Sequence, residues 1–130
     1  MPDAEGTFEI TGWDQETYDE SGGAALTRAE VRKAFSGGLV AIGEARLLLA
    51  QAAEGAAAYV GLERIDGVLG GRDGTFVIVH HATTWEGGEE ALAAIIPGSG
   101  TGGLSGVSGT LALTRHDDGS HSYRITYALE

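Results

Sequence analysis

Glycine clusters divide this chain of 130 residues into short segments, and they limit the folds open to it more than any other feature. Glycine accounts for 22 residues against 2 prolines, and no Gly-X-Y period indicates collagen. The clusters recur mostly every 11 to 18 residues, a spacing typical of strands and hairpins rather than long helices. Asp73-Gly74 and Asp118-Gly119 are dipeptides that favour hairpin turns, because both turn positions need a positive φ. The spacing predicts short strands joined by turns.

Several segments between the clusters alternate apolar and polar residues, as half-buried strands do. Val31, Lys33 and Phe35 share one face of the second segment, and the alternate residues of 123–129 share one face of the last. We therefore expect their side chains to face the core.

Two segments, 44–54 and 89–96, are rich in Ala, Leu and Glu, and their propensity alone favours helices. Helices this short are marginal, and an isolated helix would leave sheet edges to cover. We predict strands there as well. The expected fold is one all-β domain over residues 1–130, a small antiparallel β-barrel of seven or eight strands.

The chain is strongly acidic, because 19 Asp and Glu against 8 Lys and Arg give a formal net charge of −11. Such a surface repels nucleic-acid phosphates and anionic membrane surfaces, so we expect no nucleic-acid or membrane partner. The absence of cysteine excludes disulfides, thiol catalysis and cysteine-ligated zinc. The first residues lack the basic and apolar regions of a secretory signal, and no apolar run approaches the roughly 18 residues of a membrane span. We expect a cytoplasmic protein of a prokaryote-like cell.

Five stretches of the chain carry a resemblance when they are read together. They are GTFEI at 6–10 with Trp13, YVGLERI at 59–65, GGRDGTFVI at 70–78, His80, and PGSGTG at 97–102. In this order, over nearly the whole chain, they resemble a bacterial domain of unknown function, number 3224 in that series. Members of that family are similar to the allene oxide cyclase β-barrel, so the resemblance implies that fold and no particular activity. Arg46 and Gly103 depart from the family pattern, in which acidic residues are more usual.

The resemblance also helps to choose the inner face of the predicted barrel. The chosen residues are Tyr59, Gly61, Glu63 and Ile65, then Phe76, Ile78 and His80, with Glu44, Arg46 and Leu48 from the strand before and Tyr123 and Tyr127 from the last. Small barrels of about eight strands enclose either packed side chains or room for one small ligand. An apolar interior with a few converging polar groups is the usual composition of a ligand pocket. We predict Lys33, Arg46, Tyr59, Tyr123 and Tyr127 as ligand-binding residues.

Glu63 and His80 are the predicted catalytic residues. Burial raises the pKa of a carboxyl group and histidine titrates near neutrality, so this pair can move protons. A structural interpretation stands beside it: Glu63 forms a buried ion pair with Lys33 or Arg46 that fixes the barrel register, since buried charges need partners. For His80 the alternative is a hydrogen-bonded core histidine. The sequence leaves both open.

The histidines do not predict a metal site. His80 and His81 are neighbours on a strand, so they point to opposite faces and cannot chelate one ion. His116 and His121 flank a predicted turn beside Asp117, but a third firm ligand is lacking. We predict neither a metal nor a cofactor.

Two classes of function fit these observations. The first is a barrel that binds a small apolar or amphipathic molecule and isomerises or cyclises it without a cofactor, by holding a reactive conformer. The second is a non-catalytic ligand-binding or stress-related barrel with a structural buried charge cluster. A homo-oligomeric building block is a third alternative. A lumen cavity of about 300 Å³ or more favours the first class, and a core filled by side chains favours the second.

Overall fold

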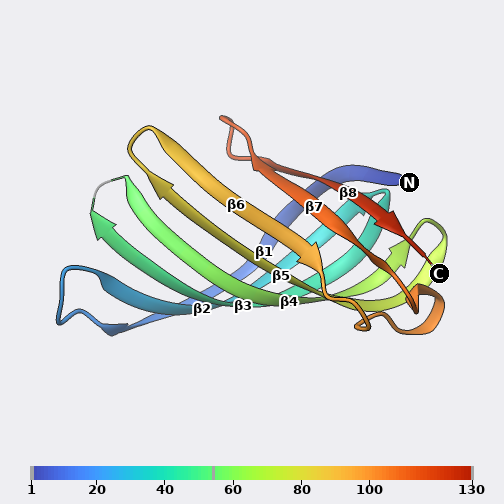
Figure 1. Ribbon diagram of the computed structural model, residues 1–130, viewed down its shortest axis with the longest axis horizontal. Coiled ribbons are helices and arrows are strands. Elements are labelled where there is room, and N and C mark those ends of the chain that lie inside the picture. Colours follow the sequence, from blue (N-terminus) through green and yellow to red (C-terminus); the bar gives the residue numbers. More distant parts are fainter. Residues whose placement is uncertain (1, 54, 130) are drawn as a thin grey trace.

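Eight strands follow one another along the chain, and neighbouring strands pair in antiparallel fashion to form a closed barrel in the order β1 to β8 (Figure 1). The structure is a computed structural model that describes residues 2–53 and 55–129. The strands are β1 (Asp3–Asp19), β2 (Ala25–Gly37), β3 (Leu39–Ala53), β4 (Ala56–Leu69), β5 (Arg72–Trp85), β6 (Gly88–Ile95), β7 (Ser108–Arg115) and β8 (His121–Ala128), with a short 3-10 helix, η1 (Gly102–Leu104).

The predicted all-β barrel is confirmed, and so are strands in both helix-favouring segments. Residues 44–53 lie in β3 and residues 89–95 in β6, while Glu54, the end of the first predicted segment, lies outside the described residues. Each strand gains two hydrogen-bonded neighbours in the sheet, and this tertiary pairing overrides the helix propensity of Ala, Leu and Glu.

One predicted turn is misplaced. The β4–β5 hairpin turns at Gly70 and Gly71, whose φ angles are 58° and 80°, whereas Asp73 and Gly74 already lie in β5. Gly74 has another reason to lack a side chain, because a Cβ there would overlap the carbonyl oxygen of Thr101. The second predicted turn is correct: the amide of Gly119 donates a hydrogen bond to the carbonyl of His116 at 2.9 Å.

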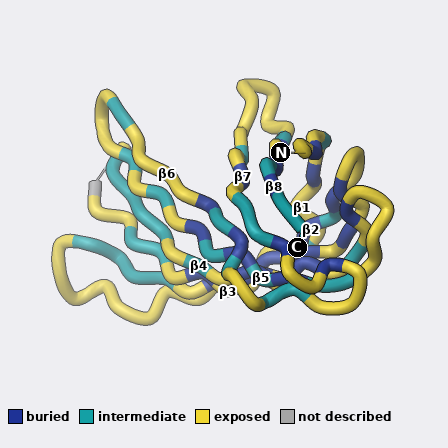
Figure 2. Tube along the Cα trace, turned by 45° about the vertical axis from the view of Figure 1, so that its right-hand side comes forward, coloured by how far each residue is buried: buried dark blue, intermediate teal, exposed yellow. Residues whose placement is uncertain are grey.

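The sheet closes into a complete barrel along only one half of the strands' length, and along the other half it stays open between β1 and β6. β1 pairs with β8 only from Asp3 to Phe8, and the single β6–β7 register pair in the described chain joins Ala94 to Thr110. The remaining parts of β1 to β6 extend beyond β7 and β8, toward the left of Figure 1. We call the two parts the closed half and the open half. Buried residues concentrate in the closed half, and the ends of the open half are exposed or half-buried (Figure 2).

Side chains fill the closed half. Phe76 and Ile125 are fully buried, and the ring of Phe35 packs against those of Phe8 and Tyr123 at centroid distances of 5.3 and 5.6 Å. The loop after β6 covers this part of the barrel beside β5, where Ser99 Oγ accepts a hydrogen bond from the amide of Val77 at 3.0 Å. The filled core is what the second functional hypothesis predicts for this half.

Candidate functional site

Four polar side chains on the inner face form one connected cluster at the junction of the two halves, which we call the inner polar cluster. It consists of Lys33 on β2, Tyr59 and Glu63 on β4, and His80 on β5. Oε1 of Glu63 lies 3.0 Å from Nζ of Lys33 and 3.2 Å from Nε2 of His80. On the other side of the imidazole, Nδ1 lies 3.0 Å from the hydroxyl of Tyr59.

Strand register explains why these residues meet. Tyr59 and Glu63 are four residues apart on β4 and therefore share its inner face. Gly61 lies between them and is the direct cross-strand partner of His80. The imidazole therefore sits between the phenol and the carboxylate, and Lys33 reaches Glu63 from across β3. The result is a line of groups that runs from ammonium to carboxylate, imidazole and hydroxyl.

The carboxylate of Glu63 is enclosed. Glu63 is 0% exposed, and neither its Oε2 nor Nε2 of His80 has a hydrogen-bond partner among the described residues. The contact between Nε2 and Oε1 is therefore close enough for an ion pair without being an aligned hydrogen bond. Gly43 on β3 makes the space for it, because a Cβ at this position would overlap Oε2 and lie 2.9 Å from Cε1 of Phe35. A buried charge is tolerated only when it is paired, so the two contacts at Oε1 maintain the ionised form.

The pKa values agree with this assignment of charge. Burial by itself raises the pKa of Glu63, but the contacts with His80 and Lys33 outweigh it, and the pKa lies below its usual value. Burial, with the negative charge of Glu63, raises the pKa of Tyr59 above 10.0. At neutral pH Glu63 is therefore a carboxylate and Tyr59 keeps its proton.

The direction of the hydrogen bond between His80 and Tyr59 follows from the tautomer of the imidazole. In the tautomer that carries its proton on Nε2, beside the carboxylate of Glu63, Nδ1 is bare. In that tautomer Tyr59 donates its hydroxyl proton to Nδ1, and the lone pairs of the phenol oxygen stay available. The hydroxyl–imidazole–carboxylate order is that of a catalytic triad, which is recognised by geometry and roles rather than by residue position.

The hydroxyl end of the cluster belongs to the open half. Inner-face residues around it are only half-buried: Thr27, Leu49, Ala57, Tyr59, Gly61, Ala82 and Thr84. A small apolar cluster of Ala29, Val31, Ala45 and Leu47, with Leu49 and Tyr59 packed against it, lines the same region. The buried carboxylate is thus connected through His80 to a phenol on a partly accessible apolar surface.

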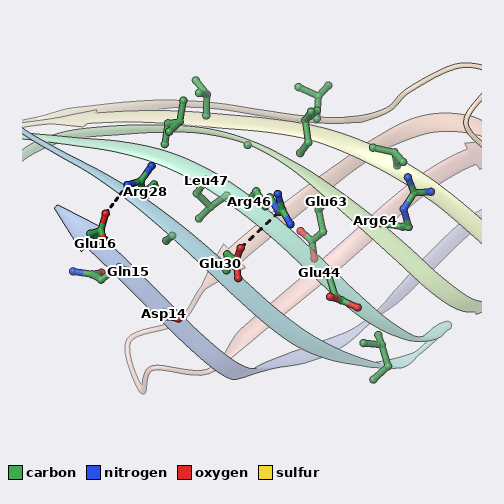
Figure 3. A pocket seen from close by; sticks show the side chains of 18 of the residues that line it. Asp14, Gln15, Glu16, Arg28, Glu30, Glu44, Arg46, Leu47, Glu63 and Arg64 are labelled. Atoms are coloured by element: carbon green, nitrogen blue, oxygen red, sulfur yellow. Dashed lines mark hydrogen bonds and ion pairs between the residues drawn. The ribbon is translucent and has the colours of Figure 1, made fainter. Parts of the chain in front are cut away.

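Arg46 does not join the cluster, and the predicted inward face of its strand is wrong. Its side chain is 86% exposed on the outer face, 3.8 Å from Glu30 (Figure 3). The inward residues of this part of β3 are Gly43, Ala45 and Leu47, not Glu44, Arg46 and Leu48. Both charged residues of this segment lie on the outer face, so its alternation favours the observed orientation; the inward face had been chosen with the help of the resemblance. A hollow of about 1510 Å³ lies along this outer face of β1 to β5, lined in part by Arg46, Leu48 and Leu62.

The two tyrosines of β8 are buried in the closed half. The hydroxyl of Tyr123 accepts a hydrogen bond from the amide of Leu39 at 2.8 Å and lies 2.8 Å from the carbonyl oxygen of Ser36. Burial raises the pKa of Tyr123. Tyr127 is 6% exposed and belongs to the same core. Both were placed correctly on the inner face, but neither lies on its half-buried part.

Two residues near the cluster escaped the sequence analysis. Gly43 belongs to no recognisable sequence motif. Its role, to leave space for the Glu63 carboxylate, follows only from the strand register that pairs it with Lys33 and Ile65. His121 stacks on Phe8 with ring centroids 4.9 Å apart, and burial lowers its pKa, as do Arg115 and Lys33. His121 had been considered only as a metal ligand.

No group of three or more His, Asp or Glu side chains in the described residues lies close enough to hold a metal ion. No helix in the described part of the chain is long and apolar enough to cross a membrane.

Comparisons with known proteins identify relatives without an assigned activity. The model of a family described as "Protein of unknown function (DUF3224)" matches residues 4–127. A crystal structure at 1.84 Å resolution of a DUF3224 protein of unknown function from Shewanella oneidensis MR-1 is 32% identical, with a TM-score of 0.90 over 100% of this chain and 98% of the other. No curated protein matches the chain. The likeness to allene oxide cyclases stays a prediction.

Proposed function

This chain belongs to the DUF3224 family of β-barrels, whose description assigns no function, and we propose that it binds a small, largely apolar molecule in its open half and relays a proton to and from it. The observation that carries the proposal is the arrangement of Glu63, His80 and half-buried Tyr59: Nε2 of His80 lies 3.2 Å from Oε1 of Glu63, and Nδ1 is hydrogen-bonded to the hydroxyl of Tyr59. The ligand would lie on the apolar surface around Leu49 and present one oxygen to Tyr59.

The relay has two states. With neutral His80, the phenol oxygen of Tyr59 accepts a hydrogen bond from an enol hydroxyl of the ligand while its own proton points to Nδ1. Transfer of both protons leaves the ligand as an enolate and His80 as an imidazolium whose charge Glu63 stabilises. The protonated Nδ1 then returns a proton through Tyr59 to the α-carbon of the enolate, which gives the keto form. This step moves one proton within the ligand and exchanges no electrons with it, so it is an isomerisation that needs no cofactor.

Tyr59 is the one member of the cluster that would touch the ligand, and the other three act through it. His80 acts as the base. Glu63 orients the imidazole and stabilises its protonated form, and Lys33 maintains Glu63 in its ionised form. Catalysis of this kind contributes typically 10²- to 10⁴-fold to a rate. Lys33 is thus a positioning residue, with no ligand contact of its own.

A purely structural role for the cluster is the second candidate. It is favoured by the complete burial of Glu63 and by the side chains that fill the closed half. On this alternative the ion pair fixes the register of β2 against β4, and the open half has no bound molecule. Removing the Tyr59 hydroxyl would then change stability only.

The test uses three probes of equal chain length: a medium-chain secondary alcohol, the matching ketone and the matching hydrocarbon. Binding is followed by amide chemical shifts in two-dimensional NMR. We expect all three probes to perturb residues of the open half. The alcohol alone can donate a hydrogen bond to the phenol oxygen, so it should bind about fivefold more tightly than the ketone and the hydrocarbon, the value of one net hydrogen bond. Tyr59→Phe should remove that difference. Equal binding of all three probes by the wild type, or no perturbation of the open half, would reject the proposal.

A further inference from the structure

Six large apolar side chains lie exposed on the outer face of two adjacent strands, and no part of the described chain covers them. They are Val40, Ile42 and Leu48 on β3 and Val60, Leu62 and Val68 on β4, each 39% to 59% exposed. With Glu44 and Arg46 of β3 and Arg64 and Asp66 of β4, which lie between the apolar residues at the two ends, we call this surface the outer strip. Exposed apolar residues gathered on one face often mark an interaction site.

From the charges on the outer strip, we infer that it binds a second copy of this chain about a two-fold axis that runs between β3 and β4. Glu44 and Arg64 are direct cross-strand partners at its middle, and neither forms an ion pair within the described residues. A surface that holds adjacent charges of opposite sign, both without ion-pair partners, can be complementary to itself.

Strand register determines which residues would meet. An axis parallel to the two strands places each residue opposite its cross-strand partner in the other copy. Glu44 then faces Arg64, Leu48 faces Val60, and Val40 faces Val68. An axis perpendicular to the strands that passes through this pair would instead place Glu44 against Glu44 and Arg64 against Arg64, which like-charge repulsion disfavours. For an axis through the middle of the strip, the charges therefore favour the first arrangement.

The charge of the whole molecule favours this face over others. Two copies that each carry −11 repel one another over most of their surfaces. The outer strip carries two acidic and two basic side chains, Glu44, Asp66, Arg46 and Arg64, so it has no net formal charge. It therefore repels a second copy less than the rest of the acidic surface does.

Sedimentation velocity over a range of protein concentrations tests the inference. We expect a dimer at micromolar concentration that Ile42→Glu converts to monomer, because Ile42 faces Asp66 of the other copy and the new carboxylate creates two like-charge pairs. Trp85→Glu is the control, because Trp85 is similarly exposed, at 45% against 54% for Ile42, but lies at the end of β5 away from the strip, and it adds the same charge. Circular dichroism should show that both variants keep the barrel. A wild-type monomer at all concentrations, or equal dissociation by the control, would overturn the inference.

A charge exchange tests the axis itself. Glu44→Arg and Arg64→Glu should each raise the dissociation constant of the homodimer at least about tenfold, because each places two like-charge pairs in the interface. An equimolar mixture of the two variants should form a heterodimer, in which both contacts are again between opposite charges. Native mass spectrometry distinguishes the heterodimer by mass. Failure of the mixture to associate would overturn the proposed axis, and no pairing within one chain can imitate the restoration.

Discussion

Replacing Glu63 by glutamine removes the one negative charge that the inner polar cluster contains. The side chain keeps its shape, but the ammonium of Lys33, whose side chain is only 9% exposed, loses its counter-charge. Breaking a buried pair on one side typically costs about 3–5 kcal/mol. At about 2.1 cal/mol/K of unfolding entropy per residue, a chain of 130 residues loses roughly 11 °C of melting temperature for each 3 kcal/mol.

The assay is thermal unfolding followed by circular dichroism, with two companion variants. Glu30→Gln removes an exposed carboxylate that lies 3.8 Å from Arg46, and it should shift the melting temperature little. Lys33→Met combined with Glu63→Gln leaves no unpaired buried charge, so it should lose less stability than Glu63→Gln alone. A melting temperature for Glu63→Gln within about 3 °C of the wild type would refute the reasoning.

Three further outcomes follow from the site. Gly43→Ala should destabilise the barrel by displacing the Glu63 carboxylate, and Gly22→Ala, at a position with open space around it, serves as its control in urea unfolding. The folded-state pKa of Glu63 lies below 4.5, so its contribution to stability is present above that pH and is lost as the pH falls through the folded value; urea titrations should show a steeper acid loss for the wild type than for Glu63→Gln. The raised pKa of Tyr59 has the opposite effect: the neutral phenol's contribution to the free energy of unfolding is present below pH 10.0 and is lost as the pH rises above it. Tyr59→Phe should therefore lose less stability at alkaline pH than the wild type.

The sequence predicted the fold class well because two signals agreed. Glycine spacing and residue alternation both favoured strands, and closure of the sheet explained how Ala- and Leu-rich segments could be strands as well. The turn at Gly70-Gly71 was missed because Asp73-Gly74 is the stronger hairpin dipeptide. Contact between Gly74 and the loop at Thr101 is long-range and leaves no local signal.

The candidate site was predicted in part, for a related reason. Lys33, Tyr59, Glu63 and His80 lie on strands whose inner face was identified correctly, so their meeting could be expected. The orientation of β3 was predicted wrongly, because Glu44 and Arg46 were assigned to the inner face although a charged pair on a strand usually lies outward. Exposed Val40, Ile42 and Leu48 share the outer face with them and weaken the alternation, and these residues belong to the outer strip.

The proton position on His80 tests the relay most directly. Nitrogen-15 NMR of the imidazole at neutral pH distinguishes a protonated nitrogen from one that accepts a hydrogen bond. The relay predicts a neutral ring with the proton on Nε2, beside Glu63, and with Nδ1 accepting from Tyr59. In Tyr59→Phe the Nδ1 shift should move toward that of a nitrogen without a hydrogen bond. A proton on Nδ1 in the wild type at neutral pH would contradict the relay.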